Sequence, residues 1–180
     1  AITLKLQDLG MAGSPLGQQL TVEEDAPGGG RRVTFEHGQI HWRPDLGAFG
    51  SWGPVHEAWT NSLGGPAGQA GYPRSDTRPG PNGGAFQLFE HLGLYWRDTT
   101  GAQPVWGGIL EAYGKVGGPA VLGYPLAPEE AAPQGGRQVR FESGVITWRG
   151  DLGARAVFGA IQAKWNELGG PAGFVGLPWR

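Results

Sequence analysis

The sequence predicts an α+β protein made of tandem repeats, each a β-hairpin plus a short α-helix plus a Gly/Pro corner, stacked as an arc or pseudo-symmetric ring. Three similar segments recur along the chain, with Phe35, Phe89 and Phe141 in register at intervals of 54 and 52 residues. Within each segment apolar and polar residues alternate, which is typical of β-strands, and the apolar spacing then becomes helical. A fixed period of this length indicates a repeat architecture.

Glycine and proline are abundant, at 35 and 15 of the 180 residues, a content usually found in disordered chains. The chain is nevertheless 11% aromatic and has 8 Trp, and a disordered chain rarely carries so many aromatic side chains. The two observations agree if Gly and Pro recur at turns between folded elements. We therefore expect an ordered array with turns at regular intervals.

Charge and cysteine content exclude several classes of function. The net charge is −2 and the 14 Lys and Arg residues are scattered, which argues against binding to a nucleic acid backbone. The chain has no Cys, so it has no disulfide, thiol nucleophile or Cys-based metal site. No apolar run approaches the ~18 residues that cross a bilayer, so we expect no transmembrane segment. No charged and apolar leader is present at Ala1, and we expect any signal peptide to be absent or removed.

Each repeated segment contains a predicted β-hairpin. The segments are GGRRVTFEHGQIHWRPDLGA at 29–48, GGAFQLFEHLGLYWRDTTGA at 83–102 and GGRQVRFESGVITWRGDLGA at 135–154. In the first, a two-residue turn at 37–38 would place Val33 and Phe35 opposite Trp42 and Ile40 on an apolar face. The alternate side chains are polar, so the hairpin is predicted to have one apolar and one polar face.

A short helix is predicted after each hairpin, because the apolar residues change to a spacing of three or four. These residues are Val55, Trp59 and Leu63, then Ile109, Tyr113 and Val116, then Ile161, Trp165 and Leu168. Gly follows each set directly and would end the helix. The segment 1–9 matches 160–168, so the chain begins with another copy of this element.

A Gly/Pro corner closes each unit, and the corners divide the chain. They are AGYP at 70–73, LGYP at 122–125, VGLP at 175–178 and a shortened AGSPLG at 12–17. The single repeat domain, residues 1–180, then contains a partial unit at 1–17 and units at 18–73, 74–125 and 126–178. A hairpin with one helix cannot bury its own apolar face, so neighbouring units must stack. Because the first and last helices are equivalent, we expect an arc, or a ring with an imperfect junction.

The repeated unit resembles the LGFP repeat, a module named for its Leu-Gly-x-Pro corner. The resemblance covers the whole chain and depends on the corners, on F-E-x-x-x-x-x-W hairpins at 35–42, 89–96 and 141–148, and on Gly-Gly-Pro blocks. Ala70 stands where the family has Leu, and Leu177 stands where an aromatic residue is usual. LGFP repeats occur in tandem in exported proteins of actinobacteria, often attached to cell-wall enzymes.

The resemblance implies a secreted, cell-wall associated module without catalytic activity. Its expected partner is a cell-wall polysaccharide, such as arabinogalactan or peptidoglycan, and a fused or neighbouring envelope enzyme is a further expected partner. Several similar shallow sites on one array would gain affinity by avidity. We expect no cofactor and no metal.

Aromatic and arginine side chains are the candidate ligand contacts, because sugar rings stack on aromatic rings and their hydroxyls bond planar polar groups. The candidates are Trp42, Trp96, Trp148, Arg43, Arg97, Arg149, Tyr72, Tyr124 and Tyr95. The alternative roles are core packing for the Trp residues, salt bridges for the Arg residues and corner packing for the first two Tyr residues. The second hairpin carries Phe86, Leu88 and Tyr95 on a face that is polar elsewhere, which indicates either a neighbouring unit or a binding site.

No catalytic residue is predicted. Glu36, Glu90 and Glu142 recur once per unit, and their likeness indicates structure or repeated binding, since catalysis would distinguish one copy from the others. The four His residues lack the paired helical spacing of a metal site. Two alternatives to wall binding remain open. One is a glycan hydrolase at a repeat junction that uses Asp45 or Asp151 with a Glu and a His, and the other is a scaffold that presents aromatic residues to an envelope protein.

Overall fold

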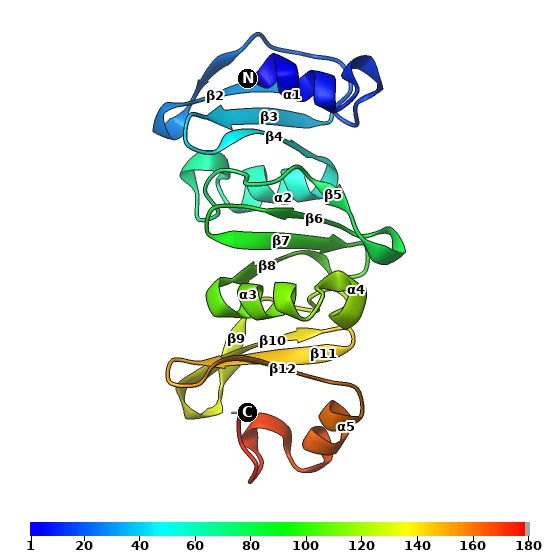
Figure 1. Ribbon diagram of the computed structural model, residues 1–180, viewed down its shortest axis with the longest axis vertical. Helices are drawn as coiled ribbons and strands as arrows, with labels where there is room; N and C mark the ends of the chain where they lie inside the picture. The colour runs from blue at the N-terminus through cyan, green and yellow to red at the C-terminus, as the bar shows by residue number, and fades with distance from the viewer. Residues whose placement is uncertain (179–180) are drawn as a thin grey trace. The chain divides into compact units, whose positions relative to one another are not determined.

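Three β-sheets alternate with helices along the chain in the computed structural model, which describes residues 1–178 (Figure 1). The four-stranded sheets have the strand orders β1-β2-β3-β4, β5-β6-β7-β8 and β12-β11-β10-β9. Adjacent strands of the first and third sheets pair antiparallel. The prediction of repeated α+β units is confirmed.

The bounds of the elements repeat with the sequence. The first sheet contains β1 Glu24–Ala26, β2 Gly30–Phe35, β3 Gly38–Arg43 and β4 Gly47–Trp52. The second contains β5 Arg78–Pro79, β6 Ala85–Leu88, β7 Leu92–Arg97 and β8 Gly101–Trp106. The third contains β9 Glu130–Ala132, β10 Gly136–Phe141, β11 Gly144–Arg149 and β12 Gly153–Phe158. The helices are α1 Ile2–Asp8, α2 Gly53–Ser62, α3 Gly107–Lys115, α4 Pro119–Leu122 and α5 Gly159–Glu167.

The chain forms two compact units. The first consists of Ala1–Pro79 with Ala85–Leu94, and the second consists of Gly80–Gly84 with the chain from Tyr95 onward. The arrangement of the repeats as an arc or a ring stays a prediction.

The hairpin turns lie one residue earlier than the sequence predicts. Strands β2 and β3 are joined by residues 36–37 and Gly38 begins β3, so the prediction of a turn at 37–38 is wrong. Gly38 is needed in the strand because it pairs with Trp52 of β4, where a Cβ atom would lie 2.1 Å from the carbonyl oxygen of Ser51. The observed cross-strand pairing is shifted by two residues from the predicted pairing. A shift of two leaves each side chain on its predicted face of the sheet, because successive side chains alternate between the faces.

A third long strand follows each hairpin, and the sequence pattern does not predict it. In β4, Gly47 and Gly50 interrupt the alternation of apolar residues, so the pattern alone does not indicate a strand. This strand nevertheless pairs with β3 along its whole length. The repeated unit is therefore a four-stranded sheet followed by a helix, with the predicted hairpin at the centre of the sheet.

The first sheet is covered on both faces in the first unit. The cluster on the α1 side contains Ile2, Leu16, Val33, Phe35 and Ile40. On the other side, the ring of His41 lies 4.9 Å from that of Trp59 in α2 and 6.0 Å from that of Tyr72. His41 is only 1% exposed, so the face that the sequence predicts as polar is an interior surface here.

The third sheet lies between two helices in the second unit, where α3 and α5 both contact β11 and β12 (Figure 1). On the α5 side, Val145, Val157 and Trp165 form a buried cluster. On the α3 side, the indole of Trp148 meets Gly108 at the start of the helix. The helix–sheet–helix arrangement thus occurs in both units, and it places Trp148 beside the N-terminus of α3.

Candidate functional site

The repeated glutamates close the Gly/Pro corners. The carboxylate of Glu36 accepts a hydrogen bond from the N–H of Gln18 at 2.8 Å, and Glu90 and Glu142 do the same for Tyr72 at 2.8 Å and Tyr124 at 3.0 Å. Each bond joins one corner to the turn of the next hairpin. A carboxylate accepting a backbone N–H forms a charge-assisted bond, so the likeness of the three residues has a structural cause.

Two of the three predicted arginines, Arg43 and Arg97, lie in ion-pair networks with these same glutamates. Arg43 donates to Glu90 at 3.1 Å and to Asp45 at 2.7 Å, and Arg97 donates to Glu142 at 3.0 Å. Hydrogen bonds from Arg43 to these two carboxylates raise the pKa of its guanidinium.

Arg149 differs from Arg43 and Arg97 in its partners. It donates to Asp151 at 2.6 Å and to the amide oxygen of Gln134 at 2.6 Å, without a Glu from a following hairpin. The ligand role predicted for the three Arg residues stays a prediction, and their observed partners are within the protein.

The predicted tyrosines point into the protein. Tyr72 and Tyr124 are 2% and 1% exposed, and their hydroxyls donate to the carbonyl oxygens of Pro27 and Pro81. Guanidinium groups lie over their rings, with Arg43 4.9 Å from the Tyr72 centroid and Arg97 5.5 Å from the Tyr124 centroid.

Tyr95 is also buried, and its ring lies 4.9 Å from that of Tyr113. Burial raises the pKa of its hydroxyl. The three tyrosines thus occupy interior positions, and their predicted ligand role stays a prediction.

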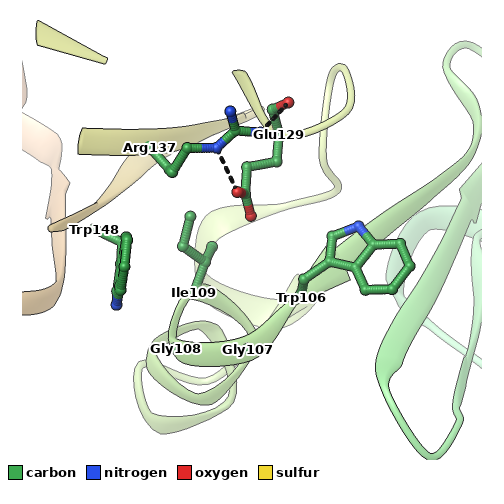
Figure 2. Close-up of a pocket in the computed structure, with 7 residues that line it drawn as sticks. All are labelled: Trp106, Gly107, Gly108, Ile109, Glu129, Arg137 and Trp148. Carbon is green, nitrogen blue, oxygen red and sulfur yellow. Dashed lines mark hydrogen bonds and ion pairs between the residues drawn. The ribbon is translucent and has the colours of Figure 1, made fainter. Parts of the chain in front are cut away.

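Among the predicted tryptophans, Trp148 lines a pocket of the second unit. Trp42 and Trp96 are half-buried, and Trp42 packs against the cluster beneath α1. Trp148 is 37% exposed and lines a pocket of about 220 Å³ in the second unit. Figure 2 shows this pocket, which is lined by Trp106, Gly107, Gly108, Ile109, Glu129, Arg137 and Trp148.

The pocket is assembled from four segments of the second unit. Trp106 ends β8, the two glycines begin α3, and Ile109 forms the apolar floor and is 2% exposed. Arg137 and Trp148 are cross-strand partners on β10 and β11. Figure 2 shows one indole on either side, with the Arg137 and Glu129 side chains above Ile109.

An ion pair supplies the polar wall of the pocket. The Nε of Arg137 lies 2.7 Å from the Oε1 of Glu129, and a second guanidinium nitrogen donates to the carbonyl oxygen of Glu129 at 3.4 Å. Arg137 is 45% exposed and Glu129 is 20% exposed in their side chains. The remaining guanidinium N–H groups and carboxylate lone pairs face a partly solvated space and can bond hydroxyl groups.

The sequence interpretation missed Trp106, Arg137 and Glu129, although a signal for two of them exists. The third repeat has Glu eight residues before an Arg that pairs across the hairpin with Trp148. The first repeat has the same three residues as Glu23, Arg31 and Trp42. The Nε of Arg31 lies 3.0 Å from Glu23, and Arg31 pairs with Trp42 across the hairpin. The aligned positions in the second repeat are Thr77 and Ala85, which cannot form such an ion pair.

The carboxylates of the alternative hydrolase are held by arginines. Hydrogen bonds from Arg43 and Arg149 lower the pKa of Asp45 and of Asp151, respectively. A general acid in glycoside hydrolysis needs a raised pKa, so the shift is opposite to the one this chemistry requires. Within residues 1–178 no group of three or more His, Cys, Asp and Glu side chains is arranged to hold a metal ion.

These features define a class of protein, a tandem α+β repeat module that presents a shallow pocket lined by aromatic residues. The sequence pattern of the LGFP repeat matches residues 13–68, 71–120 and 122–173. The chain therefore belongs to the LGFP repeat family. Over the described residues, none of the helices is both long enough and apolar enough to span a membrane.

Comparison with curated proteins finds no match. Among solved structures, selenomethionine-substituted virginiamycin B lyase from Staphylococcus aureus is similar over 79% of this chain and 45% of that protein, at 8% identity and a TM-score of 0.21. The chain thus spans less than half the length of that enzyme. A likeness this weak carries no argument about fold or function.

Proposed function

We propose that this chain is a non-catalytic, secreted module that anchors to cell-wall polysaccharide. The observation that carries the proposal is the pocket in which Trp106 and Trp148 flank the ion pair of Arg137 and Glu129. LGFP repeats are often found in cell-wall-associated proteins, which supports the choice of polymer. Arabinogalactan and peptidoglycan are the polymers we propose.

The chemistry of the pocket suits a sugar ring. An indole offers a flat apolar surface to the C–H face of a pyranose or furanose, and the neighbouring polar groups bond its hydroxyls. Because Arg137 is already neutralised by Glu129 at 2.7 Å, the polar wall has no excess charge. We therefore propose that the ligand at this pocket is a neutral sugar unit rather than a phosphate group.

A second set of the same residue types supports binding by avidity. The first repeat carries Glu23, Arg31 and Trp42 with the same ion pair and the same cross-strand pairing of Arg and Trp as the third repeat. A polymer with repeating sugars can contact two weak sites at once, so that the affinity for the polymer exceeds the affinity for one unit. This explains how a shallow pocket can hold a protein on a wall.

Co-sedimentation with insoluble cell walls tests the proposal. The chain is mixed with intact sacculi, with sacculi stripped of arabinogalactan, and with cellulose as an unrelated polysaccharide. We expect pelleting with intact sacculi and not with cellulose, and the stripped sample shows which polymer is bound. A chain that stays in the supernatant with every wall sample would contradict the proposal.

A pair of matched variants connects the binding to the pocket. Trp148→Ala removes an indole from the pocket, whereas Phe174→Ala removes an aromatic ring that is 88% exposed and lies outside it. We expect the first variant to lose most pelleting and the second to retain it, with thermal unfolding recorded for both. Equal pelleting of the two variants would place the binding surface elsewhere.

A further inference from the structure

The last Gly/Pro corner lacks the carboxylate that closes the earlier corners. At those corners Glu36, Glu90 and Glu142 accept hydrogen bonds from the N–H groups of Gln18, Tyr72 and Tyr124. The equivalent donor of the last corner is the N–H of Leu177. Among residues 1–178 no carboxylate hydrogen-bonds this N–H group.

Two apolar side chains, one in α5 and one in the last corner, are exposed where their equivalents are buried. Ile161 of α5 is 75% exposed, whereas Ile109 of α3 is 2% exposed. Val175 is 44% exposed, whereas its equivalents Ala70 and Leu122 are fully buried. The same positions are thus buried in other repeats and uncovered here.

An apolar groove lies along α5 and ends at the corner. Its volume is about 470 Å³, and its lining includes Ile161, Trp165, Leu168, Val175 and Pro178. Burial of such a surface is favourable because it removes apolar side chains from water. The apolar lining of the groove therefore favours a partner with an apolar side chain.

Trp165 shows which side chain would enter the groove. Its indole N–H donates to the carbonyl oxygen of Gly176 at 3.0 Å, as that of Trp59 does to Gly71 at 3.2 Å. The ring of Trp59 lies 5.2 Å from that of Phe89. In the second unit, the rings of Tyr113 and Phe141 are stacked at 4.3 Å.

In both of those repeats the aromatic residue of the helix therefore packs on the Phe that precedes the corner-closing Glu. Trp165 occupies the same position in α5. The side chain that fits against it is the phenyl group of such a Phe.

Arg149 offers a positive charge that can pair with the carboxylate that the last corner lacks. Arg43 and Arg97 each reach the Glu that closes a corner, at 3.1 and 3.0 Å. Arg149 instead lines a second pocket, of about 320 Å³, together with Gln134, Val175 and Leu177. Val175 lines both pockets, so the cationic and apolar surfaces adjoin.

The backbone of the corner offers acceptors in the same arrangement. In the second unit, the N–H groups of Glu142 and Ser143 donate to the carbonyl oxygens of Tyr124 at 3.1 Å and Leu122 at 2.9 Å. The equivalent acceptors at the last corner belong to Leu177 and Val175. A hairpin turn can therefore bind there by main-chain bonds as well as side chains.

We propose that this end of the chain, formed by α5 and the corner at 175–178, is a docking site for a β-hairpin that has Phe at the end of its first strand and Glu as the first residue of its turn. The occupant is a further hairpin of the same repeat type, additional to the three in this chain. Its phenyl group packs on Trp165, and its carboxylate accepts hydrogen bonds from Leu177 N–H and Arg149. A second copy of the chain does not fit this role, because its three corner-closing glutamates are occupied within the chain.

The proposal is tested by adding a fourth hairpin after the last corner. A copy of residues 126–158 is joined directly after Pro178 in place of residues 179–180, which preserves the spacing of sixteen residues between corner Pro and hairpin Phe seen at 73–89 and 125–141. The matched control carries Ala and Gln in place of Phe and Glu in the added copy. Amide hydrogen exchange of Leu177 is then measured in the 180-residue chain and in both extended chains.

We expect exchange at Leu177 to slow by about tenfold or more in the extended chain and to return toward the value of the 180-residue chain in the control. Unchanged exchange would overturn the proposal, even if the added hairpin is disordered, because a lone hairpin is stable only when it packs against a partner. Sedimentation of the 180-residue chain is measured in parallel. A dimer that already protects Leu177 would make a second copy the occupant and would also overturn the proposal.

Discussion

The indole of Trp148 lies directly over the backbone of Gly108. A Cβ atom at this glycine would be 2.9 Å from Cδ1 and 3.1 Å from Nε1 of the indole, closer than ordinary van der Waals contact. The glycine therefore lets the third sheet approach the start of α3. This approach brings Trp148 into the same pocket as Trp106.

Gly108→Ala is predicted to weaken polysaccharide binding by displacing Trp148 from the pocket. The matched control is Gly114→Ala in the same helix, where a Cβ atom would meet nothing within 4 Å. Because Ala favours a helix over Gly, the control is expected to gain roughly 0.5–1 kcal/mol of stability. Pelleting with sacculi and thermal unfolding of both variants check the prediction. Equal binding by the two would show that the position of Trp148 is unimportant.

Glu90→Gln is predicted to destabilise the first unit. Burial opposes ionisation of Glu90, but hydrogen bonds from Arg43 and from the N–H of Tyr72 outweigh it and lower its pKa. Losing this charge leaves Arg43 with a weaker partner, and we expect a cost of about 1–3 kcal/mol in the free energy of unfolding.

Asp98→Asn is the matched control for Glu90→Gln. Asp98 is 75% exposed and lies 3.6 Å from Arg97, so its loss should cost less than about 1 kcal/mol. Urea unfolding of both variants gives the comparison. A cost for Glu90→Gln no larger than that of the control would contradict the structural role of the corner bond.

The repeats could be predicted from the sequence, but several of the contacts that join them could not. The helices follow from apolar spacing, as in Val55, Trp59 and Leu63, because one face of each is buried. His41 lies among polar residues in the sequence and is nevertheless covered by Trp59 and Tyr72. No alternation pattern can predict this, because the covering residues come from another element.

The pocket is also a product of long-range contact. Gly108 and Trp148 are far apart in the sequence, and glycines at the start of a helix indicate only a local preference. The Glu and Arg of the ion pair recur in the first repeat, and this recurrence is a usable signal. The corner bonds also have a constant spacing of eighteen residues between donor and acceptor. Only the structure shows that each of these bonds joins one corner to the hairpin that follows it.

Acid is predicted to destabilise the first unit through His41. Burial lowers the pKa of His41 to about 3 and that of the nearby His56 to about 4, whereas the value in the unfolded chain is 6.5. Neither ring nitrogen of His41 has a hydrogen-bond partner among the described residues. The unfolded state therefore binds protons first, and stability present above pH 6.5 is lost as the pH falls toward 3.

His41→Phe separates this titration from other effects of acid. The loss expected from one such His is about 1.4 kcal/mol for each pH unit below 6.5, until the pH reaches the folded pKa. In His41→Phe, the slope of unfolding free energy against pH between 6.5 and 5 should be smaller. His91→Asn, a change at an exposed position, is the control and should keep the slope of the parent. Parallel slopes for all three proteins would exclude His41 as a source of the effect.

The number of sugar sites is predicted to be two, one at each ion pair of the first and third repeats. Arg31→Gln and Arg137→Gln should each remove one site, and the double variant should remove both. Calorimetric titration with a short oligosaccharide from the bound polymer is then expected to give two sites in the parent, one in each single variant and none in the double variant.

The polymer should respond more steeply than the oligosaccharide, because losing one of two linked sites can reduce avidity by about 10²–10⁴-fold. Arg140→Gln is the matched control, since Arg140 is 61% exposed and pairs with Glu130 outside the pocket. It should leave both titrations unchanged. A single site in the parent that vanishes in Arg137→Gln alone would show that the first repeat has the residues of the site without its function. In that case binding to the wall would depend on the pocket between Trp106 and Trp148 alone, and the affinities for the polymer and for the oligosaccharide would be similar.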